Sequence, residues 1–279
     1  MRFDWSRTYV MGILNVTSDS FSGDGVLNKV ESAAVEQAQN FEKWGADIID
    51  VGGESTRPGS EKVSEDVELS RVLPVIEALR TEVSIPLSVD TYKSGVARAA
   101  LEAGASWIND VWGFRADPRM AEVASEFRCP VVLMHNRSSP DDVSLSDDLG
   151  GRFVGVEYDN LIEDVKRELM YSVDLALSAG VEEENIILDP GIGFGKTVEQ
   201  NLQLIRRLDE IKALGFPVLL GPSRKSFIGY TLDLPVDQRV EGTAAAVSVG
   251  ILKGADVVRV HDVREMVRVA RMTDAILTA

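Results

Sequence analysis

The sequence predicts an α/β fold: a single (β/α)₈ TIM barrel that spans residues 1–279, with the active site at the C-terminal face of its strands. Eight short apolar runs alternate with helical patterns along the chain. The runs are apolar enough to be buried on both faces, as parallel strands covered by helices are. The length of 279 residues suits one barrel, because α/β barrels of roughly 250 residues form a single domain.

The eight apolar runs are the expected strands. Each run ends in polar or glycine-rich residues and is followed by a helical pattern, which is the spacing of βα units. In chain order the expected strands are residues 8–14, 46–51, 86–90, 106–110, 130–135, 185–190, 216–221 and 255–260. The clearest helical stretches are residues 156–179, 198–213 and 262–277. Eight such units fit closure into a barrel better than an open sheet.

Three connections between these elements are long and polar. Residues 15–28 and 52–65 follow the first and second strands, so in a barrel they rise from the face where active sites lie. We expect both to be mobile active-site loops. Residues 136–155 form a third long connection, but it carries no obvious chemistry and is predicted to be a plain surface excursion.

The composition disfavours several classes of protein. Asp and Glu number 45 against 29 Lys and Arg, and the net charge of −16 repels the phosphates of nucleic acids. The acidic surplus fits either an ordinary solvated surface or adaptation to salt, and the sequence leaves both open. Hydrophobic residues make up 44%, enough for a large core, so wholesale disorder is not expected.

The N-terminal segment and the cysteine content indicate a cytoplasmic protein. The segment MRFDWSRTYVMGIL has charges and aromatic residues where a signal peptide needs an apolar stretch. No run of about 18 apolar residues occurs, so no membrane association is expected. Cys129 is the only cysteine, which rules out an intrachain disulfide and suggests a core thiol in a reducing compartment.

Polar residues lie where six of the eight expected strands end. A lone carboxylate at a strand end is often a helix cap, but capping is a poor explanation when so many strand ends agree. In a barrel these positions converge on one mouth. The residues are Asn15, Asp90, Asn109, Asp189, Lys225, Arg259 and His261.

The chemistry of this set indicates a binding site for a polar heterocycle that carries phosphate. Its carboxylates and amides can read the donors and acceptors of a ring edge, and its Lys, Arg and His can meet an anion. A covalent mechanism is not expected. Neither His135 nor His261 is paired with a serine or cysteine nucleophile, and Cys129 lies at a strand start, away from the mouth.

The stretch LDPGIGFGKT (188–197) invites comparison with nucleotide-binding loops, because glycines between a strand and a helix can cradle phosphate. A GxxxxGK[ST] loop that ends at Thr197 would need glycine in place of Pro190. A GxGxxG loop that begins at Gly191 would need glycine in place of Lys196. The stretch fails both templates, so a nucleotide-binding fold is disfavoured.

Seven segments resemble the signatures of the dihydropteroate synthase family, in the same order and over nearly the whole chain. The motifs NVTxDSF, STRPG and SRK together are specific to that family, whereas the barrel and the pocket aspartates also occur in folate-dependent methyltransferases. The segments are GILNVTSDSFSGDG (12–25), GADIIDVGGESTRPGS (45–60), LSVDT (87–91), GASWINDVWG (104–113), ILDPGIGFGKT (187–197), GPSRKSFIG (221–229) and RVHDV (259–263).

The resemblance implies an enzyme of folate biosynthesis that joins 6-hydroxymethyl-7,8-dihydropterin pyrophosphate to para-aminobenzoate and releases pyrophosphate. It implies a pterin pocket formed by Asp90, Asn109, Asp189 and Lys225, with Arg259 stacked over the ring. By the same resemblance, Asn15 binds a Mg²⁺ cofactor. The residues expected to contact the pyrophosphate are Asn15, Thr56, Arg57, Arg259 and His261.

The resemblance also implies a second subsite and a mechanism. The aminobenzoate site, which sulfonamides occupy in the family, is expected from Phe21, Thr56, Pro58, Phe194, Gly221, Ser223 and Lys225. The reaction is expected to be a dissociative substitution, in which a pterin methylene cation forms and the arylamine attacks it. The expected catalytic residues are Asp90, Arg57, Lys225, Arg259 and His261.

The chain departs from the family pattern in the first loop and after the fifth strand. Ser18 replaces a common proline, and SGDG (22–25) stands where SDGG is usual, so no role is assigned to Asp24. MHNR (134–137) stands where MHMRG is usual, and His135 and Asn136 are left out of the predicted site for that reason.

Two other functions and one assembly fit parts of the pattern. A pterin-binding methyltransferase of a corrinoid system shares the barrel and the pocket, but it has no reason to keep STRPG or SRK. A relative that binds pterin without catalysis is disfavoured by the intact Asn15, Arg57, Lys225 and His261. A homodimer through the last helices is a family expectation, although the apolar stripe of residues 262–277 is as compatible with packing within the chain.

Overall fold

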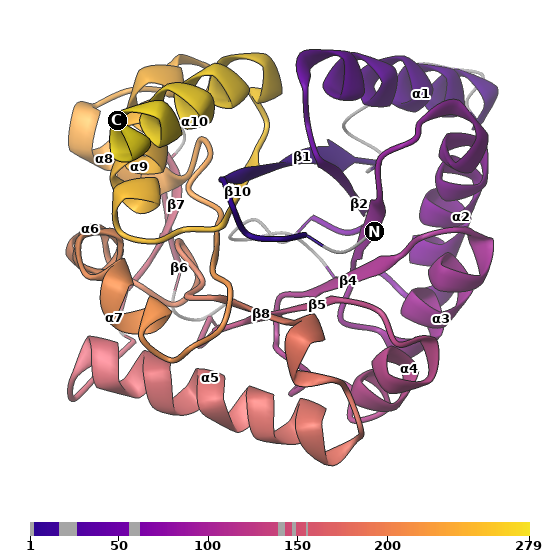
Figure 1. The fold of residues 1–279 in the computed structure, drawn as a ribbon, viewed down its shortest axis with the longest axis horizontal. Coiled ribbons are helices and arrows are strands. Elements are labelled where there is room, and N and C mark those ends of the chain that lie inside the picture. The colour runs from indigo at the N-terminus through magenta and orange to yellow at the C-terminus, as the bar shows by residue number, and fades with distance from the viewer. Residues whose placement is uncertain (1–2, 17–26, 56–61, 139–142, 147–148, 155) are drawn as a thin grey trace.

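The computed structural model describes residues 3–16, 27–55, 62–138, 143–146, 149–154 and 156–279. Within them, a ring of parallel strands is surrounded by helices (Figure 1). The strands follow one another in the order β8-β5-β4-β3-β2-β1-β10-β9, and a parallel bridge between Leu188 and Val218 joins the two ends of this order. The predicted (β/α)₈ barrel is confirmed.

Each barrel strand overlaps a run predicted from the sequence. The strand β9 is shorter than the predicted 216–221, because Pro217 has no N–H and Val218 donates its N–H to the Asp256 carboxylate at 2.7 Å. The barrel strands are β1 (Tyr9–Asn15), β2 (Ile48–Gly52), β3 (Leu87–Asp90), β4 (Trp107–Asp110), β5 (Val131–Met134), β8 (Ile186–Asp189), β9 (Leu219–Leu220) and β10 (Val257–Val260).

Helices form the outer layer of the barrel (Figure 1). Thr197 begins α6 through a capping box with Gln200, and the predicted helix 198–213 is divided at Arg207 into α6 and α7. In the described part of the chain, none of the helices combines the length and the apolar character needed to cross a bilayer. The α-helices are α1 (Leu27–Trp44), α2 (Glu65–Glu82), α3 (Ser94–Ala103), α4 (Met120–Phe127), α5 (Leu161–Ser178), α6 (Val198–Arg206), α7 (Leu208–Lys212), α8 (Ser226–Leu232), α9 (Val240–Leu252) and α10 (Val263–Thr278).

Two cores follow from the alternation of side chains along the strands. Outward residues such as Leu14, Val51 and Val89 belong to a large core between the strands and the helices. Inward residues near the strand starts, such as Met11 and Trp107, form a smaller core inside the barrel. Because apolar side chains fill the N-terminal end of the interior, a binding site has room only at the C-terminal end.

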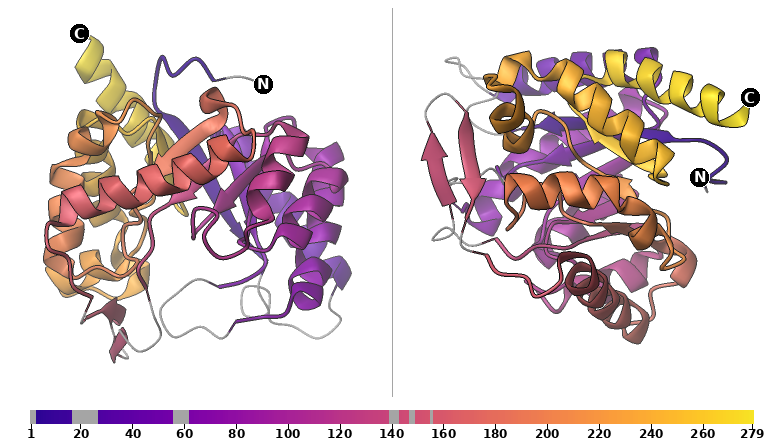
Figure 2. Two further views of the ribbon diagram at one scale, coloured as in Figure 1. Left: turned by 90° about the horizontal axis from the view of Figure 1, so that it is seen from below. Right: turned by 90° about the vertical axis from the view of Figure 1, so that its left-hand side faces the viewer.

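The connection 136–155 is more than the plain surface excursion that the sequence predicts. It contains an antiparallel hairpin of β6 (Val143–Ser146) and β7 (Gly150–Phe153). Figure 2 shows the hairpin at the end of the molecule opposite the two termini. The buried Arg239 donates to the Leu149 carbonyl at 3.1 Å, which ties this connection to the start of α9. Sequence patterns missed the hairpin because its strands belong to no βα unit.

Candidate active site

Four residues lie side by side at the carboxyl ends of β1 to β4. The strand register pairs Asn15 with Gly52, Gly52 with Asp90, and Asp90 with Asn109. Residues in register share one level of the sheet, so these four form one layer of the barrel mouth. A methyl group placed on Gly52 would lie 3.6 Å from Asp90 Oδ2 and 3.8 Å from Asn15 Oδ1, so the two oxygens border the same space.

Asp50 lies one layer deeper and is a site residue that the sequence analysis missed. It precedes Gly52 by two positions in β2, so its side chain lies on the same inner face. Its Oδ2 accepts Asn109 Nδ2 at 2.9 Å and Arg259 Nε at 2.6 Å. Its buried Oδ1 has no hydrogen-bond partner among the described residues, which makes it an acceptor available to a ligand. The signal that could have found it is a carboxylate inside an apolar strand.

Arg259 connects the two carboxylates of this region. From the inner face of β10 it donates to Asp50 Oδ2 at 2.6 Å and to Asp90 Oδ2 at 2.5 Å. Burial would lower the pKa of Arg259, but the charges of Asp50 and Asp90 raise it above its ordinary value. Burial raises the pKa of Asp90 to about 7, against the guanidinium of Arg259 and with the help of Asp50. One cation thus pairs with two carboxylates, and the protonation state of Asp90 changes near neutral pH.

Asp189 and Lys225 form another part of the pocket. Asp189 ends β8, and its Oδ1 accepts the N–H of Gly191 at 2.7 Å. Lys225 donates from Nζ to the carbonyl of Ile192, in the glycine loop (residues 191–195) that follows Asp189. Burial raises the pKa of Asp189 and lowers that of Lys225 to about 8, and each charge opposes the shift of the other. The two groups therefore stabilise each other in their charged forms.

The chain after β9 adds Ser223 to the same region, beside His261 at the end of β10. The buried Ser223 Oγ accepts the His261 backbone N–H at 3.1 Å and lies 3.0 Å from His261 Nδ1. Gly221 borders both cationic side chains, because a methyl group placed on it would lie 3.8 Å from Arg259 Cβ and 3.9 Å from Lys225 Nζ. Phe194 reaches the same place, with Lys225 Nζ 4.8 Å from its ring centroid.

Several residues considered in the sequence analysis lie outside the described residues. They are Phe21, Asp24, Thr56, Arg57 and Pro58. Residues 53–55, which precede Thr56, are held by ion pairs. Lys93 pairs with Glu54 and, at 2.5 Å, with the buried Glu68. Residues 53–55 therefore leave β2 beside a charged anchor at the barrel mouth.

The other candidate nucleophile and base are buried away from this pocket. Cys129 precedes β5, and burial raises the pKa of its thiol to about 12. His135 contacts Lys196 and Glu168 and has no serine or cysteine partner among the described residues. Cys129 and His135 therefore do not form a nucleophile–base pair. The expectation that neither histidine pairs with a serine is wrong for His261, because its Nδ1 lies 3.0 Å from Ser223 Oγ.

The charge balance of the pocket indicates what it stabilises. Three carboxylates, Asp50, Asp90 and Asp189, face two cationic side chains, Arg259 and Lys225. Among these five side chains, the carboxylates outnumber the cations by one. Such a pocket favours a ring with several N–H donors and stabilises positive charge that develops on it.

Comparison with known proteins identifies the family. The model of the pterin binding enzyme family matches residues 11–261. A dihydropteroate synthase from Clostridium beijerinckii is 53% identical over 272 residues, which cover 97% of this chain and 95% of the relative. The chain belongs to the dihydropteroate synthase family.

Solved structures of dihydropteroate synthases share the whole fold. One from Clostridium difficile, determined in the presence of pteroic acid, has a TM-score of 0.89 and 49% identity and covers 98% of each chain. One from Yersinia pestis, in complex with a sulfonamide drug, has a TM-score of 0.88 and 39% identity, over 99% of this chain and 97% of that one. The dihydropteroate synthase function predicted from the sequence is confirmed, and the methyltransferase alternative is not supported.

Proposed function

We propose that the chain transfers the pterin methylene group of 6-hydroxymethyl-7,8-dihydropterin pyrophosphate to the amine of para-aminobenzoate, with the help of Mg²⁺. The observation that carries this proposal is the in-register layer of Asn15, Gly52, Asp90 and Asn109, with Asp50 beneath it. A relative determined in the presence of pteroic acid, which contains both the pterin and the aminobenzoate groups, supports it.

The buried acceptors are proposed to read the aminopyrimidine edge of the pterin. Asp189 Oδ2 and Asp50 Oδ1 would accept its N–H groups, since Asp189 Oδ1 is engaged by Gly191 and Asp50 Oδ2 by Arg259 and Asn109. Asn109 has committed its Nδ2 to Asp50 and offers its Oδ1 carbonyl. Lys225 and Arg259 would border the ring. An edge left unpaired here would cost about 1–3 kcal/mol per group.

The proposed mechanism is a dissociative substitution. The C–O bond between the pterin methylene and pyrophosphate breaks, and its electron pair leaves with the pyrophosphate. The pocket carboxylates stabilise the positive charge of the methylene cation. The aminobenzoate nitrogen then forms the C–N bond and loses a proton to solvent. Arg57, Arg259 and His261 are proposed to hold the departing oxygens.

A Mg²⁺ ion fits the donors near Asn15. Mg²⁺ is usually held by one or two protein oxygens together with substrate phosphates and water. Asn15 offers a carbonyl oxygen in the open layer, and the described residues hold no group of three His, Cys, Asp or Glu that would form an all-protein metal site. When bound, the ion would neutralise charge on the leaving pyrophosphate.

We expect Asn15→Ala to lower Mg²⁺-dependent turnover by about tenfold or more and to leave the affinity for 6-hydroxymethylpterin, which lacks pyrophosphate, unchanged. The measurements are turnover at varied Mg²⁺ and calorimetry with the pterin. Asn185→Ala, before the start of β8 at the far end of the barrel, is the control. Equal loss of turnover and pterin affinity in Asn15→Ala would assign Asn15 a structural role instead.

The aminobenzoate subsite predicts how a sulfonamide should act. Phe194, Ser223 and Lys225 match the family pattern, and we expect a sulfonamide to inhibit competitively with aminobenzoate. We also expect tight binding only when pyrophosphate and Mg²⁺ are present. Phe21, Thr56 and Pro58 belong to the two long loops 15–28 and 52–65, which we propose pyrophosphate and Mg²⁺ bring together over the site. Inhibition kinetics and calorimetric titrations with and without pyrophosphate check this. Noncompetitive inhibition would place the drug elsewhere.

The direct test of the proposed function is an assay of the purified chain with pterin pyrophosphate, aminobenzoate and Mg²⁺. We expect release of pyrophosphate and formation of 7,8-dihydropteroate, and both should depend on each component. Pterin binding without pyrophosphate release would show that the chain binds pterin but does not catalyse. No pterin binding at all would contradict the pocket assignment.

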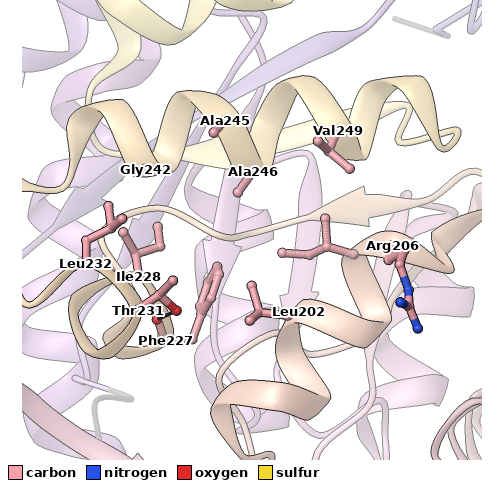
Figure 3. Close-up of a pocket in the computed structure, with 11 residues that line it drawn as sticks. Leu202, Arg206, Phe227, Ile228, Thr231, Leu232, Gly242, Ala245, Ala246 and Val249 are labelled. Carbon is pink, nitrogen blue, oxygen red and sulfur yellow. Dashed lines mark hydrogen bonds between the residues drawn. The ribbon is translucent and has the colours of Figure 1, made fainter.

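We further propose that the chain works in the cytoplasm as a homodimer. The apolar stripe predicted in residues 262–277 packs within the chain at Val263, Met266, Val267 and Ala270, whereas Met272 is exposed. Other exposed apolar residues gather on α6, α8, α9, α10 and the turn after α8; they are Leu202, Leu232, Val236, Val249, Leu252, Ile276 and Leu277. An apolar groove of about 290 Å³ lies between α9 and the two helices α6 and α8. Figure 3 shows the side chains that line it. A second copy of the chain would cover this surface.

Sedimentation equilibrium tests the dimer. We expect the wild-type chain to have twice the mass of one chain, and Val249→Arg to be a monomer with an unchanged circular dichroism spectrum, because a charge would be buried in the interface. Tyr171→Arg, an exposed aromatic position on α5, is the matched control and should remain dimeric. A dimeric Val249→Arg would move the interface to another surface.

A further inference from the structure

A buried lysine lies behind the glycine loop. Lys196 is 2% exposed, and its Nζ lies 2.9 Å from Gly191 O, 2.8 Å from Phe194 O and 3.0 Å from His135 Nδ1. An ammonium has three N–H donors and no acceptor, so these three acceptors use each donor once. Two of the bonds close the glycine loop on itself, and the third ties it to the chain after β5. In a phosphate-binding loop the backbone N–H groups and the lysine face the phosphate, whereas this lysine donates to carbonyls of the loop.

His135 is oriented so that it can accept the bond from Lys196. Its Nε2 lies 3.0 Å from Glu168 Oε2, and Arg137 Nε donates to Glu168 Oε1 at 2.9 Å. Burial, together with the charge of Lys196, lowers the pKa of His135 to about 3, so the imidazole is neutral at physiological pH. A neutral imidazole that donates from Nε2 to a carboxylate presents the lone pair of Nδ1 to the lysine.

The glycine loop is pressed against the backbone that carries His135. Gly191 and Gly195 have φ of +71° and +58°, a region that favours glycine. A methyl group on Gly191 would lie 1.8 Å from the His135 carbonyl oxygen, and one on Gly195 would lie 2.7 Å from the Arg137 carbonyl carbon. The loop therefore has no room to move back, and Lys196 closes the contact from behind.

The side of the glycine loop that faces the pocket positions two groups of the proposed pterin site. The Gly191 N–H orients the Asp189 carboxylate at 2.7 Å, and the Ile192 carbonyl accepts Lys225 Nζ. A methyl group on Gly193 would lie 2.9 Å from Lys225 Cδ, so the loop also supports the stem of this lysine. Any shift of the loop would move Asp189 and Lys225 together.

We infer that Lys196 is a positioning residue of the pterin site: bonded to His135, which Glu168 orients, it fixes the glycine loop on the side away from the pocket and thereby positions the Asp189 carboxylate and the Lys225 ammonium. The inference deepens, and rests on, the proposed pterin site. The charge of Lys196 also favours the carboxylate form of Asp189, as do Lys225 and Arg259. Burial disfavours the ammonium of Lys196, which Asp189 and Glu168 favour and Lys225 and Arg137 oppose.

The test is Lys196→Met, which keeps the length of the side chain and removes its donors. We expect the dissociation constant of 6-hydroxymethylpterin, measured by calorimetry, to rise about tenfold or more. We also expect the pH profile of pterin affinity to change. Binding needs an ionised Asp189 and is lost as pH falls; without the nearby cation, Asp189 takes up its proton at a higher pH, so the loss of affinity should begin at a higher pH. Lys166→Met, a surface lysine paired with Glu163 on α5, is the control.

Three outcomes are separable. If the wild-type chain does not bind the pterin, the proposed function fails. If the wild-type chain binds it and folded Lys196→Met binds equally well with the same pH profile, the inference is overturned. If Lys196→Met does not fold, nitrogen NMR of the wild-type chain decides: we expect His135 to be a neutral imidazole with the proton on Nε2 from pH 5 to pH 9, approximately. An imidazolium at His135 would mean that Lys196 is not the donor, and the inference would fall.

Discussion

Asp189→Asn is expected to lose pterin binding, with a rise in the dissociation constant of at least about a hundredfold. The carboxylate is buried at the end of β8 and belongs to the pocket that we propose binds the aminopyrimidine edge. An amide has almost the same shape, so the loss would arise from hydrogen bonding and charge and not from packing.

The local structure decides which way the new amide must point. Gly191 N–H needs an acceptor and lies 2.7 Å from Asp189 Oδ1, so the oxygen of the substituted amide would stay on that side. Its NH₂ group would then face the pterin, donor against donor. A rotation of the amide to avoid this would leave the buried Gly191 N–H facing an NH₂ group, which costs about as much.

Calorimetry with 6-hydroxymethylpterin measures this effect without depending on catalysis. Asp174→Asn, at an exposed position on α5, is the matched control and should bind as the wild-type chain does. Near-normal affinity in Asp189→Asn would refute the assignment of this carboxylate to the pterin edge.

The fold and one layer of the site could be predicted from the sequence because their signals are local. Apolar runs that end in polar residues mark the strands, and parallel pairing brings the strand ends to one face. Asn15, Asp90 and Asn109 were found this way, and the register then places them in a single layer. Lys225 and Arg259 were found by their positions after β9 and in β10.

The residues that sequence analysis missed depend on pairings that no local pattern carries. Asp50 lies inside an apolar strand, and only the register with its neighbours shows that it faces Arg259, which is 209 positions away in the chain. His135 and Lys196 are 61 positions apart, and their contact requires both the positive φ of the glycine loop and its packing against β5. The motif around Lys196 resembled a phosphate loop in composition, whereas its bonds run to loop carbonyls.

Arg259→Met is expected to have the largest effect on turnover, with a fall in kcat/KM of about a thousandfold. The guanidinium bonds Asp50 at 2.6 Å and Asp90 at 2.5 Å, and both carboxylates lie in the proposed pterin site. Removal of the cation leaves two buried carboxylates with a smaller compensating charge. It would also remove a group proposed to hold the pyrophosphate.

The pH dependence of this variant separates its electrostatic effect from a general loss of structure. Burial raises the pKa of Asp90 to about 7 even though Arg259 opposes the shift, so loss of Arg259 must raise it further. In the wild-type chain, kcat/KM should rise with pH as Asp90 ionises near pH 7, because kcat/KM reports groups of the free enzyme. In Arg259→Met the same limb should begin at higher pH.

Stability should change with pH in the direction set by the same group. A carboxyl group whose pKa is raised in the folded chain contributes stability that is fully present below its pKa in the unfolded chain. This stability is lost as pH rises toward and through its pKa in the folded chain. At about pH 6 Asp90 in Arg259→Met is neutral and needs no partner, whereas at about pH 9 it approaches its charged form, and breaking the pair costs up to about 3–5 kcal/mol. Urea unfolding at both pH values measures the difference, with Arg98→Met, which breaks an exposed pair with Glu126, as the control. Equal destabilisation of Arg259→Met at the two pH values would show that Asp90 does not titrate in this range.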